Sequence, residues 1–201
     1  MNVKNPLIIK LSTWFSNLMN PLISLVIYFI YLSNFAENNN SSPYRLLLAI
    51  LIVILPIAAW IFYNVRKGNY TNMDVSNQKQ RRTLYYFIYA VVFVFILAQY
   101  LIHGDIDIEA SFLLLLLLLM GISNYLIKSS MHTAFNMFVA ALYFSHNITL
   151  GIIWLTITFI VGITRLILKR HSLSEVVMGA FIGSIVSIAY LYTQIQIQHS
   201  L

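Results

Sequence analysis

Long uncharged apolar stretches alternate with short polar connections along most of this chain. The first stretch runs from about Pro6 to Phe35, and Pro21 divides it. Proline suits the first turn of a helix but breaks its interior. We therefore expect an amphipathic interfacial helix followed by a short span, with one kinked helix as the alternative. The later stretches are about Tyr44–Asn64, Thr83–Ile102, Ala110–Ile127, Met131–Asn147, Thr149–Ile163 and Ser174–Thr193.

The lengths of these stretches predict the fold class. At 1.5 Å per residue each later stretch would be roughly 22–32 Å long, enough to cross the hydrocarbon core with modest tilt or local thinning. The pattern therefore predicts an all-α, polytopic transmembrane helical bundle with six to seven spans. We expect residues 1–43 to hold the interfacial helix and first span, and residues 44–201 to form the main transmembrane domain.

Composition excludes the other broad classes. Of the 201 residues 60% are hydrophobic and only 9% are charged, whereas a soluble chain carries about 25% charged residues. A soluble globule and a disordered tail are both excluded by this deficit. The chain has no cysteine, which excludes a disulfide framework, a thiolate metal site and a catalytic thiol.

The basic residues gather in three connections that are distant in sequence. These are the Val65–Arg82 loop and the junctions Lys128–Met131 and Ile163–Ser174, each separated from the next by two crossings. Alternation of the spans therefore predicts that all three lie on one side of the membrane. They hold nine of the twelve basic residues: Arg66, Lys67, Lys79, Arg81, Arg82, Lys128, Arg165, Lys169 and Arg170.

The net charge of +6 indicates the kind of partner. No soluble basic domain is present to bind nucleic acid, so we expect no nucleic-acid partner. Cationic connections beside a membrane instead favour lipid head groups or a phosphate-bearing substrate. We therefore expect membrane lipids and a lipid phosphate as the partners.

The junction before the last span combines three residue types that can do chemistry. Arg165 is followed six residues later by His171, and Glu175 comes four residues after that. If the last helix begins near Ser172, the Glu175 carboxylate reaches the His171 ring. It would fix the tautomer of the ring and leave the other nitrogen as a base or nucleophile. A guanidinium such as that of Arg165 can hold two oxygens of a phosphate.

Structural alternatives stand beside this chemical interpretation. The segment Ser172–Glu175 also matches a capping box, in which Glu175 would only cap the helix. Arg165 and its basic neighbours would in turn be interfacial charges that flank a span.

The preceding junction supplies a second histidine. Ser130 is suited to cap the next helix, whose amides and dipole favour an anion, and His132 falls in the first turn. A lone histidine there is more often an interfacial residue. Here two histidines, one backed by a carboxylate, share a face with several cations. Phosphoryl transfer needs this set: a nucleophile, an acid and a charge clamp.

These two segments resemble a known family. Ser130-Met-His132, followed by Arg165-x5-His171-x3-Glu175, is similar to the second and third signatures of the type 2 phosphatidic acid phosphatase (PAP2) superfamily, P-S-G-H and S-R-x5-H-x3-D. The resemblance extends over residues 79–179 and includes the glycine four residues after the acid. It implies a PAP2-like core within residues 44–201.

The resemblance also implies roles for individual residues. His171 would attack phosphorus and become a transient phosphohistidine, and Glu175 would orient it. His132 would protonate the departing alkoxide and then activate water. Arg165 and Ser130, with the backbone that follows Ser130, would bind the phosphate oxygens. The family uses no metal or other cofactor, and we expect none here.

The first signature of the family, K-x6-R-P, is not intact in this chain. The segment Lys79-Gln-Arg-Arg82 has the charges without the spacing or the proline. We assign Lys79 and Arg82 to its phosphate-clamping role. Lys128, two residues before Ser130, is a candidate substitute for the missing cation.

The other signatures are also altered. Ser129 and Met131 replace the proline and glycine of the second signature, and Thr164 replaces the serine of the third. Glu175 in place of aspartate keeps the charge but lengthens the side chain by one methylene. These departures are compatible with a substrate-divergent branch or with a member that has lost catalysis.

Three functions follow from these observations. The first is a multi-pass phosphatase of the bacterial cytoplasmic membrane, acting on a lipid phosphate or diphosphate. The second is a non-catalytic lipid-phosphate binder. The third, a transporter, is disfavoured because the chain has only seven Gly and four Pro, and its spans carry no Asp, Glu, Lys or Arg away from their ends. The positive-inside rule puts the site on the cytoplasmic side, whereas the resemblance implies the opposite side, and both stay open.

Overall fold

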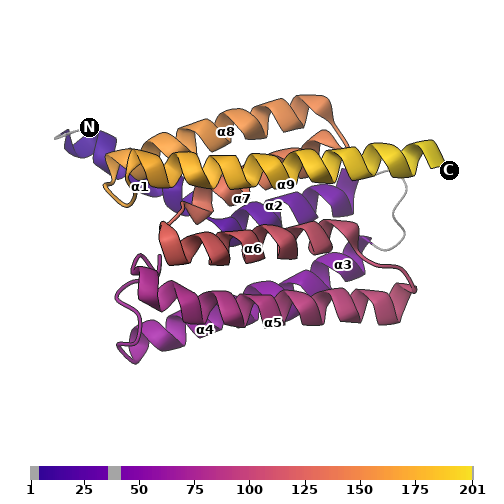
Figure 1. Ribbon diagram of the computed structural model, residues 1–201, viewed down its shortest axis with the longest axis horizontal. Coiled ribbons are helices and arrows are strands. Elements are labelled where there is room, and N and C mark those ends of the chain that lie inside the picture. Colours follow the sequence, from indigo (N-terminus) through magenta and orange to yellow (C-terminus); the bar gives the residue numbers. More distant parts are fainter. Residues whose placement is uncertain (1–4, 36–41, 201) are drawn as a thin grey trace. The chain divides into compact units, whose positions relative to one another are not determined.

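The computed structural model describes residues 5–35 and 42–200, and expectations that fall on residues 1–4, 36–41 or 201 lie outside it. Across the described residues the fold is entirely helical, which confirms the predicted class (Figure 1). The elements are α1 Pro6–Leu18, α2 Pro21–Phe35, α3 Ser42–Leu48, the π-helical segment η1 Ala49–Ile54, α4 Leu55–Arg66, α5 Gln78–His103, α6 Ile108–Leu126, α7 Met131–Phe144, α8 Ile148–Ile167 and α9 Leu173–Ser200.

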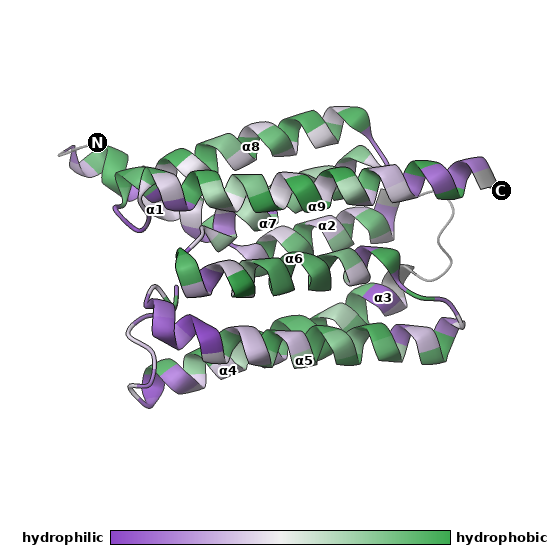
Figure 2. Cartoon of the chain, in the orientation of Figure 1, coloured by the Kyte–Doolittle hydropathy of each residue, from purple (hydrophilic) through white to green (hydrophobic). Residues whose placement is uncertain are grey.

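Several of these helices are long and apolar enough to cross a membrane, and apolar residues cover most of their lengths in Figure 2. Within the described part of the chain there are five: Tyr44–Arg66, Gln78–His103, Ile108–Leu126, Ile148–Ile167 and Leu173–His199. The pair Pro6–Leu18 and Pro21–Asn34, bent by 55°, makes a sixth if it counts as one span. The protein is therefore a multi-pass membrane protein, and the predicted break at Pro21 is confirmed.

The helices form two compact units. The first comprises the described residues up to Tyr28 together with those from Ser129 onward, and the second runs from Phe29 to Lys128. The first holds the two signature segments that resemble the phosphatase family.

Helix α7 lies at the centre of the first unit, where it packs against both α8 and α9 (Figure 1). It spans only 14 residues, about 21 Å at 1.5 Å per residue, whereas a hydrocarbon core is about 30 Å thick. The stretch expected as a span over Met131–Asn147 is thus a shorter helix that ends at Phe144. Almost all its side chains are buried, so its polar residues meet protein rather than lipid.

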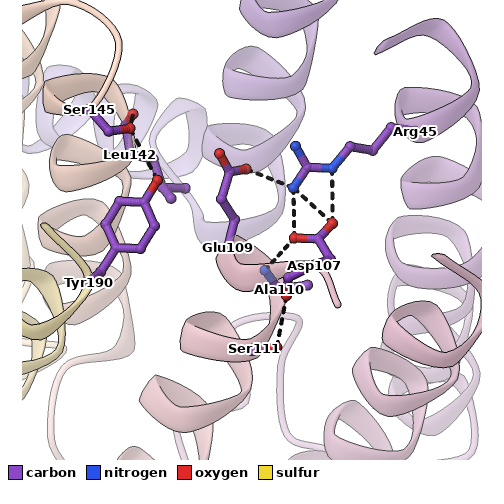
Figure 3. Close-up of polar contacts among 8 residues, drawn as sticks. All are labelled: Arg45, Asp107, Glu109, Ala110, Ser111, Leu142, Ser145 and Tyr190. Carbon is purple, nitrogen blue, oxygen red and sulfur yellow. Dashed lines mark hydrogen bonds and ion pairs between the residues drawn. The ribbon is translucent and has the colours of Figure 1, made fainter. Parts of the chain in front are cut away.

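Small residues on α9 allow it to approach α7 closely. A Cβ on Gly183 would lie 2.8 Å from the Ala134 carbonyl oxygen, and the Ser187 hydroxyl donates a hydrogen bond to the Met137 carbonyl at 3.3 Å. Further along, the hydroxyls of Ser145 and Tyr190 lie 3.1 Å apart (Figure 3). Small residues spaced four apart permit such close helix contacts in membrane proteins.

The Asn136 side chain on α7 is buried and uses its whole hydrogen-bonding capacity. Its amide nitrogen donates to the carbonyls of Met19 and His132, at 2.9 and 2.8 Å. Its oxygen accepts from the Ser24 hydroxyl at 3.0 Å and from the Trp154 indole at 3.1 Å. Because Met19 and Ser24 flank the proline break, this one amide attaches the α1–α2 break to α7 and α8.

Replacing Asn136 with leucine is expected to destabilise the protein by about 2 kcal/mol or more, because buried donors and acceptors on three helices lose their partner. The midpoint of SDS-induced unfolding measures this change. Thr156→Ala on the exposed side of α8 is the control and is expected to stay within about 0.5 kcal/mol of the wild type. Equal midpoints for Asn136→Leu and wild type would show that the amide does not hold the break.

An ion cluster joins two helix starts in the second unit (Figure 3). The Arg45 guanidinium donates to both oxygens of Asp107 at 2.8–3.0 Å and to Glu109 at 2.7 Å. Asp107 also caps α6 by accepting from the Ala110 amide. The three side chains are largely shielded from solvent, and the paired geometry fixes the start of α6 against α3.

Candidate active site

The first unit positions the signature residues at the ends of three helices. Ser130 caps α7 and His132 lies in its first turn, whereas Arg165 lies in the last turn of α8 and Glu175 in the first turn of α9. Because α7 packs against both other helices, these ends meet at one end of the unit. Two of the three basic junctions therefore converge, in agreement with the alternation of spans.

The turn between α8 and α9 explains the spacing from Arg165 to His171. Helix α8 continues beyond the predicted end at Ile163, so Arg165 is helical. Lys169 then takes a left-handed backbone conformation, with φ of 53°. This lets the amides of Arg170 and His171 both donate to the Arg165 carbonyl, at 3.1 and 3.4 Å. The chain thus folds back, and His171 lies beside the helix end that carries Arg165.

The His171 ring is held by Glu175. Its Nδ1 lies 2.9 Å from the Glu175 carboxylate, and the His171 side chain is only 1% exposed. A carboxylate accepts hydrogen bonds, so the pairing favours the tautomer that carries its proton on Nδ1, in which Nε2 keeps its lone pair. The predicted pairing of His171 with Glu175 is confirmed.

The capping alternative for Glu175 is confirmed as well. The Ser172 amide donates to the Glu175 carboxylate at 3.0 Å, and the Glu175 amide donates to the Ser172 hydroxyl at 3.3 Å. This is the reciprocal pattern of a capping box. The two interpretations are compatible, because one carboxylate oxygen accepts from both the Ser172 amide and the His171 ring. Glu175 is therefore fixed by the helix start and in turn fixes the imidazole.

Ser130 connects α7 to this turn. Its amide donates to the Glu175 carbonyl at 2.9 Å, and its buried hydroxyl accepts from the amide and the hydroxyl of Thr133, at 3.4 and 3.0 Å. The contact requires a glycine at 179, because a Cβ there would lie 2.5 Å from the Ser130 carbonyl oxygen. The glycine four residues after Glu175 thus brings the two signature segments together.

Arg165 is 2% exposed, which excludes the interpretation of this residue as an interfacial charge. Its Nη1 donates to the Ser16 hydroxyl of α1 at 3.0 Å. Lys169 and Arg170, by contrast, are exposed and fit that interpretation. His132 is 8% exposed, and its backbone carbonyl accepts from Asn136.

The three remaining predicted clamp residues lie in the second unit. Lys79 and Arg82 are exposed on α5, Lys128 is half-buried, and the Arg82 guanidinium lies over the Tyr125 ring at 4.4 Å. Their role toward a phosphate stays a prediction.

Arg81 and Ser16 are buried polar residues to which the sequence assigned no role of their own. Arg81 is 3% exposed, and its Nε donates to the Val75 carbonyl at 2.9 Å. The helical spacing could have indicated that Arg81 is buried. Arg81 lies on the same face of α5 as the buried residues Leu84, Tyr85 and Ile88, whereas Arg82 does not. Ser16 had no comparable signal, since no motif includes it.

Comparisons of this chain with protein-family models, with curated proteins and with solved structures find no match. A proposal on function therefore depends on the residues and contacts of the chain itself.

Proposed function

We propose that this protein is an integral membrane phosphatase of the bacterial cytoplasmic membrane, a divergent PAP2-like enzyme that hydrolyses a lipid phosphate or diphosphate monoester. One observation carries the proposal. Backbone and side-chain hydrogen bonds connect Ser130 to Glu175, Glu175 to His171, and His171 to Arg165. These bonds join Ser130, from a segment distant in the sequence, to the turn that carries the His171–Glu175 pair and the buried Arg165.

In the first step, Nε2 of His171 attacks the phosphorus atom. The new nitrogen–phosphorus bond forms as the bond to the leaving oxygen breaks, and His132 gives its proton to that oxygen. The leaving oxygen belongs to the lipid alkoxide in a monoester and to the remaining lipid phosphate in a diphosphate. Glu175 accepts the Nδ1 hydrogen bond throughout, so the ring stays oriented and its developing positive charge is stabilised.

In the second step, water replaces the imidazole. His132 accepts a proton from the water, whose oxygen attacks phosphorus while the nitrogen–phosphorus bond breaks. Inorganic phosphate leaves, and both histidines return to their starting states. The negative charge of each transition state would be balanced by Arg165 and by the amide dipoles at the start of α7, which Ser130 caps.

The apolar part of the substrate would stay in the bilayer or between helices, while its head group reaches this end of the first unit. Such an arrangement suits phosphatidate, phosphatidylglycerol phosphate, a polyprenyl diphosphate or a lipid A phosphate, because all present the same reacting group. A non-catalytic lipid-phosphate binder would use the same buried cation without turnover.

Phosphate release from these four lipids, measured on purified protein in EDTA, tests the proposal. We expect release from at least one of them, at a rate that EDTA leaves unchanged. We also expect a phosphate adduct that is labile to acid, as a nitrogen–phosphorus bond is. Loss of release in EDTA would contradict the metal-independent mechanism. Binding without release from any of the four lipids would favour the binder.

A further inference from the structure

Helix α1 presents an unusual face to the rest of the first unit. Its buried residues are Ser12 and Ser16, one turn apart, whereas Leu7, Leu11 and Trp14 are more than half exposed. In a soluble protein such a helix would bury its apolar side. Here the apolar side is exposed, as expected of a helix beside lipid, and the serine side packs toward α8.

The polar side of α1 reaches the arginine of the candidate site. The Ser16 hydroxyl, 1% exposed, accepts a hydrogen bond from Nη1 of Arg165 at 3.0 Å. A hydroxyl that accepts from a guanidinium still has its own proton to donate. Ser16 can therefore hold the arginine and offer a donor of its own to an anion beside it.

Hydrogen bonds at the end of α1 fix its position within the first unit. The Asn20 side chain accepts from the Ile23 amide just after the break, and the Asn136 amide donates to the Met19 carbonyl. A helix attached at its end in this way holds its last turn, and Ser16 with it, in one place. The contact of Ser16 with Arg165 is thus fixed by the packing of α1 in the first unit.

We infer that Ser16 is a positioning residue that orients the Arg165 guanidinium toward the phosphate of the substrate, so that α1 forms part of the active site. The inference rests on the proposed function. It adds a residue from outside the signature segments and connects the site to a helix whose other side is apolar and exposed.

The test compares Ser16→Ala with Ser16→Thr, which keeps the hydroxyl, and with Ser12→Ala, a buried serine one turn away. Loss of one hydrogen bond to a charged group is expected to raise KM for the lipid, and the inhibition constant of inorganic phosphate, about tenfold in Ser16→Ala. The value of kcat should fall by a smaller factor than KM rises, since His171 and Glu175 are untouched and Arg165 already contacts the phosphate in the ground state. Ser16→Thr should restore binding, and Ser12→Ala should match the wild type.

Unfolding midpoints in SDS, recorded for each variant, separate positioning from simple packing. If Ser16→Ala and Ser12→Ala lower stability and kcat alike, or if Ser16→Ala leaves KM and phosphate inhibition unchanged, the inference is wrong while the phosphatase proposal stands. If the wild-type protein releases phosphate from none of the lipids, the proposal and the inference fail together.

Discussion

Replacing His171 with asparagine is expected to reduce phosphate release by about 10⁴-fold and to abolish the acid-labile adduct. The asparagine amide can still donate to the Glu175 carboxylate, which lies 2.9 Å from Nδ1 in the native protein, so the turn keeps its hydrogen bond. It has no nucleophilic nitrogen in place of Nε2. Single-turnover assays with a lipid phosphate measure the loss, and inhibition by inorganic phosphate should persist because Arg165 is unchanged.

His146→Asn is the matched control for this substitution. His146 follows the opposite end of α7, about 20 Å along the helix from His132, and it is exposed. We expect wild-type turnover from this variant. Substantial turnover by His171→Asn would show that another group attacks phosphorus and would remove the basis of the phosphohistidine mechanism.

The helical fold could be predicted because a bilayer leaves few solutions for a chain with so few charges. Uninterrupted apolar length determines a span, and the stretches beginning at Tyr44 and Thr83 lie within long apolar helices as expected. Apolar length alone does not predict the structure of α7. Its sequence is as apolar as that of a span, but Asn136 needs four protein partners, so α7 is buried within the first unit.

The chemical core of the candidate site was predictable because its contacts are local. His171 and Glu175 are four residues apart across a helix start, and the capping pattern of Ser172 with Glu175 sets that start. Local spacing therefore determines both the cap and the imidazole–carboxylate pair. The two interpretations competed in the sequence only because each considered one hydrogen bond of the same carboxylate.

Long-range contacts could not be predicted in this way. The bond between Ser16 and Arg165 joins residues 149 positions apart, and no local pattern indicates it. The left-handed backbone conformation of Lys169 could not be predicted either, because glycine is the residue that usually marks such a turn. Both features depend on how α1, α8 and α9 pack, which hydropathy alone does not specify.

Gly179→Ala is expected to lower activity by about 10²-fold and to cost about 1–3 kcal/mol of stability. The added Cβ would lie 2.5 Å from the Ser130 carbonyl oxygen, whereas ordinary contacts begin at 3.4 Å. Helix α9 must therefore move away by about 1 Å, a misplacement large enough to affect catalysis. That movement lengthens the bond from the Ser130 amide to the Glu175 carbonyl and shifts the His171–Glu175 pair relative to the start of α7.

Gly183→Ala separates this local effect from general loosening of the helix pair. It lies one turn further along α9, and its Cβ would meet the Ala134 carbonyl at 2.8 Å, so a similar loss of stability is expected. Activity per folded molecule should fall much less, because Gly183 does not touch Ser130. Turnover normalised to the folded fraction at a temperature below both unfolding transitions measures the difference. If both variants lose activity equally, the close approach at Gly179 supports packing alone, and the junction of the two signature segments has no special role in turnover.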